Sequence, residues 1–187
     1  IGLKLDPFHK DFGPLNLSKT HKYIRELCRL LADPDQKDVV FFCHCSNKFD
    51  KQANSCLMMG IFMVVILKQN PVTVWEHFSP YHNQIMSFRD ASYGECTYDC
   101  TVNFLLWLIL KIYDPTLSLG HRARSQAGLV QIPDFDPKEY EYYEKVQNGD
   151  MNWIIPGKFI AFMGPIDNRK ENRDNSPETT FKFSNIL

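Results

Sequence analysis

One apolar stretch, Val39–Leu67, dominates the pattern of hydrophobic and polar positions along the chain. It begins with VVFF, continues through a polar turn, and ends in an unbroken apolar run from Leu57 to Leu67. This order predicts a buried strand at 39–42, then a tight loop, then a buried helix at about 53–67. Gly60 lies inside that helix, where glycine costs about 1 kcal/mol of helix propensity, and its presence there indicates close packing against a neighbour.

A second amphipathic helix is expected before this stretch. Ser18 is the expected N-cap, and the helix should end before Pro34. Its apolar face consists of Tyr23, Ile24, Leu27, Leu30 and Leu31.

Two further helices are expected after the stretch. Pro71 is suited to the first turn of a short helix over 72–78. A longer apolar helix is predicted over about 97–112, so that Cys96 and Cys100, four residues apart, would share one face.

The last predicted elements follow a change in composition. Asp136 can cap a helix of about three turns that Pro137 begins and Gly149 ends. The residues 152–164 then predict a strand interrupted at Pro156-Gly157. Strands and helices together predict an α/β fold with a central mixed β-sheet flanked by helices.

The loop that precedes the apolar helix contains Cys45, with Lys51 six residues later. Cysteine phosphatase loops use a thiolate of lowered pKa, small residues that close around the phosphate, and an arginine that binds two oxygens. Here no glycine separates Cys45 from Lys51, Phe49 is bulky, Asp50 would repel phosphate, and lysine replaces arginine. We therefore predict phosphatase-like architecture without the chemistry, and no catalytic residue in this chain.

Two other interpretations of this loop remain open. The simpler one is a strand-to-helix turn with an incidental cysteine. The other is residual phosphatase activity that depends on Cys45 and Lys51.

Charge and length exclude several classes of protein. The chain has 187 residues, with 21 Lys and Arg against 22 Asp and Glu, and a formal charge of −1. No overall field attracts it to nucleic acid or a membrane, and its longest apolar run is too short to span a bilayer. Because it lacks an initiator methionine and a signal peptide pattern, we expect the chain to begin inside a longer one.

The six cysteines mostly lie within apolar segments, which is typical of reduced thiols in a cytosolic or nuclear protein. A zinc site formed by Cys43, Cys45 and Cys56 with His44 is disfavoured, because adjacent strand residues point to opposite faces and no second close pair exists. We predict no metal and no other cofactor.

Carboxylates are concentrated in the helix predicted after Asp136, at Glu139, Glu141 and Glu144. A solvated acidic face is one interpretation of this pattern. The alternative is a row of carboxylates that lines a groove and binds a lysine or arginine of a peptide.

Several stretches carry a resemblance to a known family: DFGPLNL at 11–17, QAN at 52–54 through Gly60, FRDASYGECTY at 88–98, and FDPKEYEYYEKVQNGDMNWIIPGKFIAFMGP at 135–165. In these the chain resembles the N-terminal half of the cell-division-cycle-fourteen dual-specificity protein phosphatases, the mitotic-exit type. The likeness covers nearly the whole chain and is weakest at 71–87 and 114–126.

The resemblance implies a tandem of two phosphatase-like domains. Residues 1–133 would form a degenerate first domain, 134–150 an acidic linker helix, and 151–187 the start of a catalytic domain that continues beyond this chain. The family signature His-Cys-x-x-Gly-x-x-Arg is absent here. Thiolate attack and hydrolysis of a phosphocysteine would therefore take place in the downstream domain.

The resemblance also implies an acidic groove that favours a basic residue shortly after phosphoserine-proline. Glu141 and Glu144, with Glu139 adjacent, match its linker helix, although Gln147 stands where related sequences tend to carry a carboxylate. The implied partners are phosphoproteins with Ser/Thr-Pro near Lys or Arg and the downstream domain of the same chain; a homodimer is left open.

The implied location is the cytoplasm and nucleus, with nucleolus, centrosome or spindle as further sites. A function of another class is a non-catalytic pseudophosphatase scaffold, in which both domains are degenerate and the tyrosine-rich helix is a docking surface.

Overall fold

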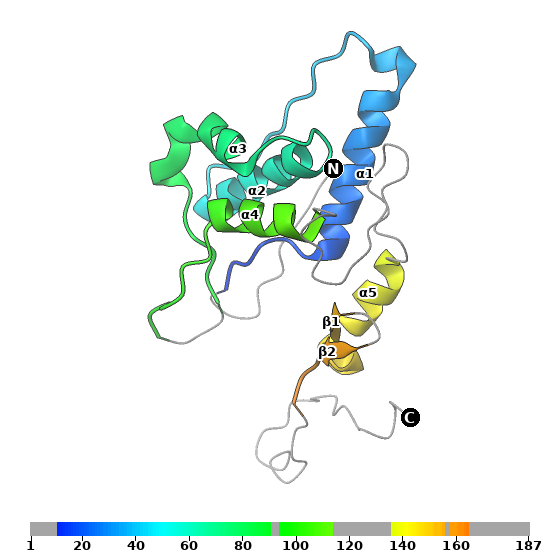
Figure 1. Cartoon of the computed structure of the whole chain (residues 1–187), viewed down its shortest axis with the longest axis vertical. Coiled ribbons are helices and arrows are strands. Elements are labelled where there is room, and N and C mark those ends of the chain that lie inside the picture. The colour runs from blue at the N-terminus through cyan, green and yellow to red at the C-terminus, as the bar shows by residue number, and fades with distance from the viewer. Residues whose placement is uncertain (1–10, 91–93, 114–135, 156–157, 165–187) are drawn as a thin grey trace. The chain divides into compact units, whose positions relative to one another are not determined.

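A computed structural model describes residues 11–90, 94–113, 136–155 and 158–164. By its internal contacts the chain divides into two compact units, residues 1–133 and 134–187. Figure 1 shows α1 to α4 in the first unit and α5 with the two strands in the second. The assignment of 134–150 as a linker and of 151–187 as the start of a catalytic domain stays a prediction.

The first unit is built around helix α2 (Phe49–Val65). It packs against α1 (Leu17–Ala32), α3 (Pro71–His77) and α4 (Val102–Tyr113), and α3 also packs against α4. Short 3₁₀ turns follow α1 and α3, at Pro34–Gln36 (η1) and Ser79–Gln84 (η2). The buried core consists of Ile24, Ala53, Leu57, Ile61, Val64, Val65, Val74, Phe88, Val102 and Leu106.

Helix α2 is buried on most sides, as its sequence predicts, because an all-round apolar helix has to be surrounded by other elements. Gly60 lies where α2 packs closely against Leu106 of α4. A Cβ atom added there would lie 2.7 Å from Cδ2 of Leu106 and 3.4 Å from Cγ1 of Val74. The predicted role of Gly60 in close packing is confirmed.

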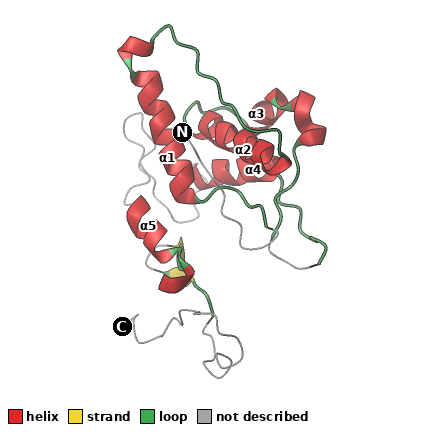
Figure 2. Cartoon of the chain, turned by 180° about the vertical axis from the view of Figure 1, so that it is seen from behind, coloured by secondary structure: helices red, strands yellow, loops and turns green. Residues whose placement is uncertain are grey.

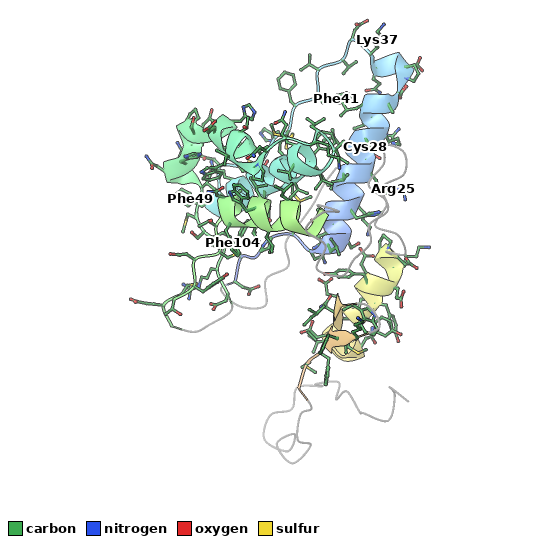
Figure 3. The ribbon with its side chains drawn as sticks, viewed as in Figure 1. Arg25, Cys28, Lys37, Phe41, Phe49 and Phe104 are labelled. Atoms are coloured by element: carbon green, nitrogen blue, oxygen red, sulfur yellow. The ribbon has the colours of Figure 1, made fainter. Side chains whose placement is uncertain are left out.

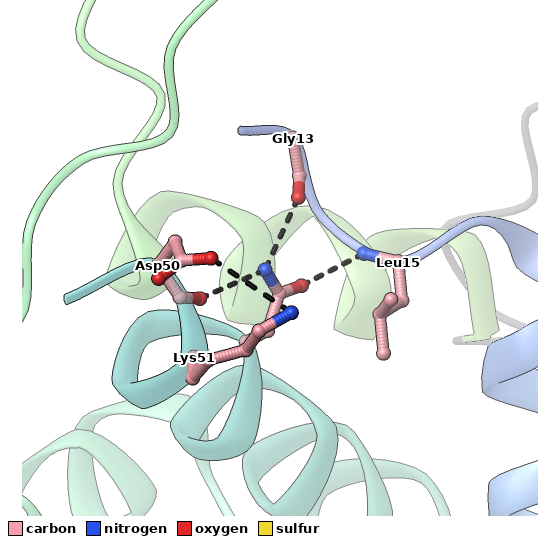
Figure 4. Close-up of polar contacts among 5 residues, drawn as sticks. Gly13, Leu15, Asp50 and Lys51 are labelled. Atoms are coloured by element: carbon pink, nitrogen blue, oxygen red, sulfur yellow. Dashed lines mark hydrogen bonds and ion pairs between the residues drawn. The ribbon is translucent and has the colours of Figure 1, made fainter. Parts of the chain in front are cut away.

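A buried asparagine joins the first turns of α2 to the segment before α1. The Leu15 N–H donates to Oδ1 of Asn54 at 2.8 Å, and Nδ2 of Asn54 donates to the carbonyls of Gly13 at 3.2 Å and Asp50 at 3.0 Å (Figure 4). The amide thereby satisfies the Leu15 N–H and the Gly13 carbonyl, which lie outside both helices.

Helix α1 begins earlier than predicted. Its N-cap is Asn16, whose Oδ1 accepts from the Lys19 N–H at 2.9 Å, so the prediction of Ser18 as the cap is wrong. Ser18 instead lies fully buried in the first turn. The predicted apolar face is only partly used, since Ile24 is buried whereas Leu31 remains 55% exposed near the end of the helix.

Helix α4 begins later than predicted, at Val102. The Phe104 N–H donates to Oγ1 of Thr101 at 3.1 Å, while the Phe88 N–H donates to the carbonyl of Cys100 at 2.8 Å in an isolated antiparallel bridge. This pairing holds Cys100 outside the helix. The expectation that Cys96 and Cys100 share a helix face is therefore wrong.

The predicted buried strand at 39–42 is also wrong. These residues form no strand, and Val40 and Phe42 are 72% and 88% exposed. Phe41, labelled in Figure 3, belongs to this irregular segment and borders a hollow of about 300 Å³ beside the end of α1 and η1. A run of β-branched and aromatic residues forms a stable strand only when another strand pairs with it. In the described part of the chain no strand pairs with residues 39–42.

The second unit contains α5 (Pro137–Tyr143), a 3₁₀ turn at Val146–Asn148 (η3), and strands β1 (Asn152–Ile155) and β2 (Phe159–Ala161). The predicted single strand is an antiparallel hairpin, with Asn152 opposite Ala161 and Trp153 opposite Ile160. The predicted three-turn helix ends at Tyr143 because the chain turns into η3.

Figure 2 shows helices throughout the described structure and strands only in this hairpin. The fold is thus mixed α/β. The described residues do not show the predicted central sheet.

Changing Asn54 to alanine should lower the free energy of unfolding by about 2–4 kcal/mol, because buried backbone groups of Gly13 and Leu15 lose their partner. Chemical denaturation of both proteins measures this. Asn83→Ala, at an exposed position of η2, is the matched control and should change stability by less than about 0.5 kcal/mol. An equal effect of the two changes would contradict the structural role of Asn54.

Changing Gly60 to alanine should destabilise the protein by about 1–3 kcal/mol despite the better helix propensity, because the new methyl group overlaps the fully buried Leu106. Thermal and chemical unfolding give the value. Gly164→Ala, where a Cβ meets nothing within 4 Å, is the control. The cost of Gly60→Ala should shrink in a Leu106→Ala background; a net gain in stability from Gly60→Ala alone would refute the close contact.

Candidate functional site

The segment that leads into α2 places Cys45 alongside the helix. Cys45 is half-buried and borders a cavity of about 90 Å³. The other residues around this cavity are Gln52, Ser55, Cys56, Tyr81, Gln84 and Ile85. Lys51 does not border this cavity.

At the first turn of α2, backbone N–H groups and the Lys51 ammonium already have partners within the turn. The Lys51 and Gln52 N–H groups donate to the carbonyl of Lys48 at 3.0 and 2.9 Å. Nζ of Lys51 lies 3.8 Å from Oδ2 of Asp50, and Figure 4 shows this pair beside the asparagine network. Because the carboxylate of Asp50 already lies at the positive end of the helix dipole, a phosphate dianion would meet a like charge there.

The thiols of Cys43, Cys45 and Cys56 lie near one another around α2. From the sequence, the three together are considered only as a metal site. Sγ of Cys43 lies 3.4 Å from Oγ of Ser55. Burial, followed by the charges of Cys45 and Cys43, raises the pKa of Cys56 to about 11, so this thiol is protonated at neutral pH. Among the described residues, no three His, Cys, Asp or Glu side chains are arranged to hold a metal ion.

The carboxylates of the second unit lie on α5 and at its end. Asp136 caps the helix, its Oδ1 accepting from the Lys138 N–H at 2.8 Å, as predicted. Glu139 is exposed, whereas Glu141 and Glu144 are half-buried. Glu144 is the C-cap residue, one position beyond the last helical residue.

Sequence reasoning missed Tyr140 as a partner of these acids. Its hydroxyl donates to Oε1 of Glu144 at 3.2 Å. The four-residue spacing between the two side chains is the signal that could have revealed the pair, since such residues are neighbours on a helix. The Tyr140 hydroxyl and the Glu144 carboxylate therefore contact each other at the end of α5.

Backbone bonds join α5 to the hairpin. The Met151 N–H donates to the carbonyl of Tyr143 at 2.7 Å, and the Met163 N–H donates to the carbonyl of Gly149 at 2.9 Å. Gly149 has a φ of 103°, a left-handed conformation that favours glycine. The end of the acidic helix is thus held at a defined position on the strands.

Residues 2–111 match the model of a protein family described as dual specificity protein phosphatase, N-terminal half. The chain belongs to this family. The resemblance stated from the sequence is confirmed. One of the stretches on which it was based begins at Phe88. In that stretch, Nη2 of Arg89 donates to the carbonyl of Gly94 at 2.6 Å.

Curated relatives of this phosphatase half share its sequence over nearly its whole length. Dual specificity protein phosphatase CDC14A of Mus musculus is 35% identical over 187 residues, which cover 97% of this chain and 29% of that protein. Dual specificity protein phosphatase CDC14C of Homo sapiens is 34% identical, with 97% and 38% covered. Tyrosine-protein phosphatase CDC14 of Saccharomyces cerevisiae is 29% identical, with 84% and 26% covered.

The chain thus spans less than two fifths of the length of each of these relatives. In the described part of this phosphatase half, no helix is long and apolar enough to cross a membrane.

Replacing Cys45 by serine in the intact protein should leave the hydrolysis of an aryl phosphate within about twofold of the unchanged protein, because Cys45 faces a cavity that Lys51 does not border. Steady-state kinetics measure kcat/KM. Cys96→Ser sets the baseline for loss of a half-buried thiol elsewhere. A large fall confined to Cys45→Ser would instead support residual activity at this loop.

Proposed function

We propose that this chain is the substrate-recognition half of a CDC14-type dual-specificity protein phosphatase, acting on phosphoserine, phosphothreonine and phosphotyrosine through a downstream catalytic domain of the same protein. The observation that carries the proposal is the match of 2–111 to the N-terminal half of such enzymes in a chain that lacks the signature His-Cys-x-x-Gly-x-x-Arg.

A non-catalytic role for the first unit is supported by the cavity at Cys45, which Lys51 does not border. A phosphate-binding loop needs backbone donors and a cation directed at one point. At the first turn of α2, two N–H groups are used within the helix and Lys51 lies by Asp50. The thiolate attack on phosphorus and the hydrolysis of the phosphocysteine are therefore assigned to the downstream domain.

The acids of α5 are proposed to bind a lysine or arginine of the substrate near a Ser/Thr-Pro site. Glu141 and Glu144 are half-buried, so an ion pair with either would be screened less than one on an open surface. The hydroxyl of Tyr140 restrains the Glu144 carboxylate, which reduces the entropy lost when a cation binds. Glu139, which is exposed, adds charge at longer range.

The proposal also covers the partners, the cellular process and the location of the protein. The partners are phosphoproteins and the downstream domain, and a role in cell division follows from the family, with action in the cytoplasm and nucleus. The alternative of a scaffold without catalysis has a direct test, since the intact protein would then hydrolyse no phosphopeptide.

In the intact enzyme, Glu141→Gln with Glu144→Gln should raise KM about two- to tenfold for phosphopeptides with a lysine or arginine after Ser-Pro, because two charge interactions are lost. Glutamine keeps an oxygen that can accept from Tyr140, so the local structure is retained. Steady-state kinetics on matched basic and neutral peptides separate the charge effect from general damage.

The control is Glu76→Gln with Glu95→Gln, which removes the same charge from exposed positions of the first unit. It should leave the ratio of KM values for basic and neutral peptides unchanged. An equal loss on both peptides in the Glu141 and Glu144 variant would exclude the proposed recognition.

A further inference from the structure

Two thiols from different segments face one cavity beside η2. Cys45 comes from the irregular segment before α2, and Cys56 comes from the middle of that helix. Both are half-buried and both are free thiols. The cavity that both border has a volume of about 90 Å³, and Cys45 is close enough for its charge to act on Cys56.

We propose that Cys45 and Cys56 are a redox-sensitive pair that hydrogen peroxide converts into a disulfide, tying the segment 43–48 to α2. This modification site is separate from the phosphatase activity proposed above and does not depend on it.

Two contacts hold Cys45 along α2. On one side of it in the sequence, Sγ of Cys43 lies 3.4 Å from Oγ of Ser55. On the other side, Nε2 of Gln52 donates to Oδ1 of Asn47 at 2.9 Å. Cys45 thus lies between two residues that are anchored on α2, and it shares its cavity with Cys56.

The backbone of this segment is free to adjust. Within the described residues, the backbone groups of 40–47 make no hydrogen bond to another helix or strand, and Ser46 only accepts from the nearby Lys48 N–H at 2.8 Å. A disulfide requires the two Cβ atoms to lie about 3.5–4.5 Å apart. Disulfide formation therefore requires the segment to place the two Cβ atoms within this range, which its few backbone hydrogen bonds permit.

Cys43 is a poorer partner for Cys56 than Cys45 is. Its sulfur is already engaged by Ser55, and its charge is, after burial, the main cause of the raised pKa of Tyr23. Cys43 does not border the cavity that Cys45 and Cys56 share.

The reaction balances with peroxide as the only oxidant. The Cys45 thiolate attacks one peroxide oxygen, the O–O bond breaks, and a sulfenic acid and hydroxide form. The Cys56 thiolate then attacks the Cys45 sulfur and displaces a second hydroxide. Two thiols and one peroxide give one disulfide and two waters. The high pKa of Cys56 makes it the second nucleophile, where proximity compensates for the small thiolate fraction.

The test treats the intact protein with hydrogen peroxide, blocks the remaining thiols, and identifies linked peptides by mass spectrometry without reduction. The expected product is a Cys45–Cys56 linked peptide that dithiothreitol removes and that raises Tm, because a cross-link constrains the unfolded chain. Cys45→Ser and Cys56→Ala should each abolish it, and Cys96→Ser should leave its yield unchanged.

Mass spectrometry of the peroxide-treated protein without substitutions tests the proposed disulfide even where Cys56→Ala fails to fold. A link from Cys56 to Cys43, oxidation of Cys45 to a sulfinic acid without any link, or unmodified thiols at Cys45 and Cys56 would each overturn the proposal. So would an equal yield of the linked peptide in concentrated urea, because the pairing would then owe nothing to the fold.

Discussion

Helix α2 is apolar on nearly every side, and its burial by α1, α3 and α4 determines the arrangement of the first unit. The contact between Gly60 and Leu106 sets how closely α2 and α4 approach. Nearer the start of α2, Asn54 connects the helix to the backbone before α1 through two hydrogen bonds, one with the Leu15 N–H and one with the carbonyl of Gly13. Apolar packing alone would allow α2 to slide or rotate, and the buried amide removes that freedom because its partners occupy fixed positions.

The hydrogen bonds of Asn54 also explain why the start of α2 does not form a phosphate-binding site. The first turn of α2 is held by Asn54, which accepts from Leu15 and donates to the carbonyl of Asp50. Asp50 therefore stays at the end of the helix where an anion would bind, with Lys51 beside it. Cys45 lies along the helix, next to Cys56. The sequence retains a cysteine and a cation of a phosphate loop, but Lys51 lies by Asp50 whereas Cys45 borders the cavity beside Cys56.

The parts of the fold that the sequence predicted well are those with local causes. Apolar content defines α2, Pro71 and Pro137 mark the first turns of α3 and α5, and Asp136 caps α5 as expected. The errors have non-local causes. Cys100 is kept out of α4 by pairing with Phe88, a residue that nothing in the adjacent sequence indicates.

The same division applies to the candidate sites. The pair of Tyr140 and Glu144 could be predicted, because their spacing on a helix is regular. The pair of Cys45 and Cys56 could not, because it depends on side-chain contacts between an irregular segment and α2. For the run at 39–42, high β-propensity did not produce a strand where the described chain supplies no pairing neighbour.

Charge distribution bears on how the acidic helix could select a substrate. The residues 136–145 contain four carboxylates and two lysines, a local charge of −2, whereas the whole chain carries −1. The remaining residues are thus slightly positive in sum, and a basic peptide is not attracted to the chain at long range. Selectivity must then come from direct contact, where the position of each carboxylate matters more than the number of charges. In the proposed recognition of a basic residue, the hydroxyl of Tyr140, which donates to Glu144 at the end of α5, would supply that positional control.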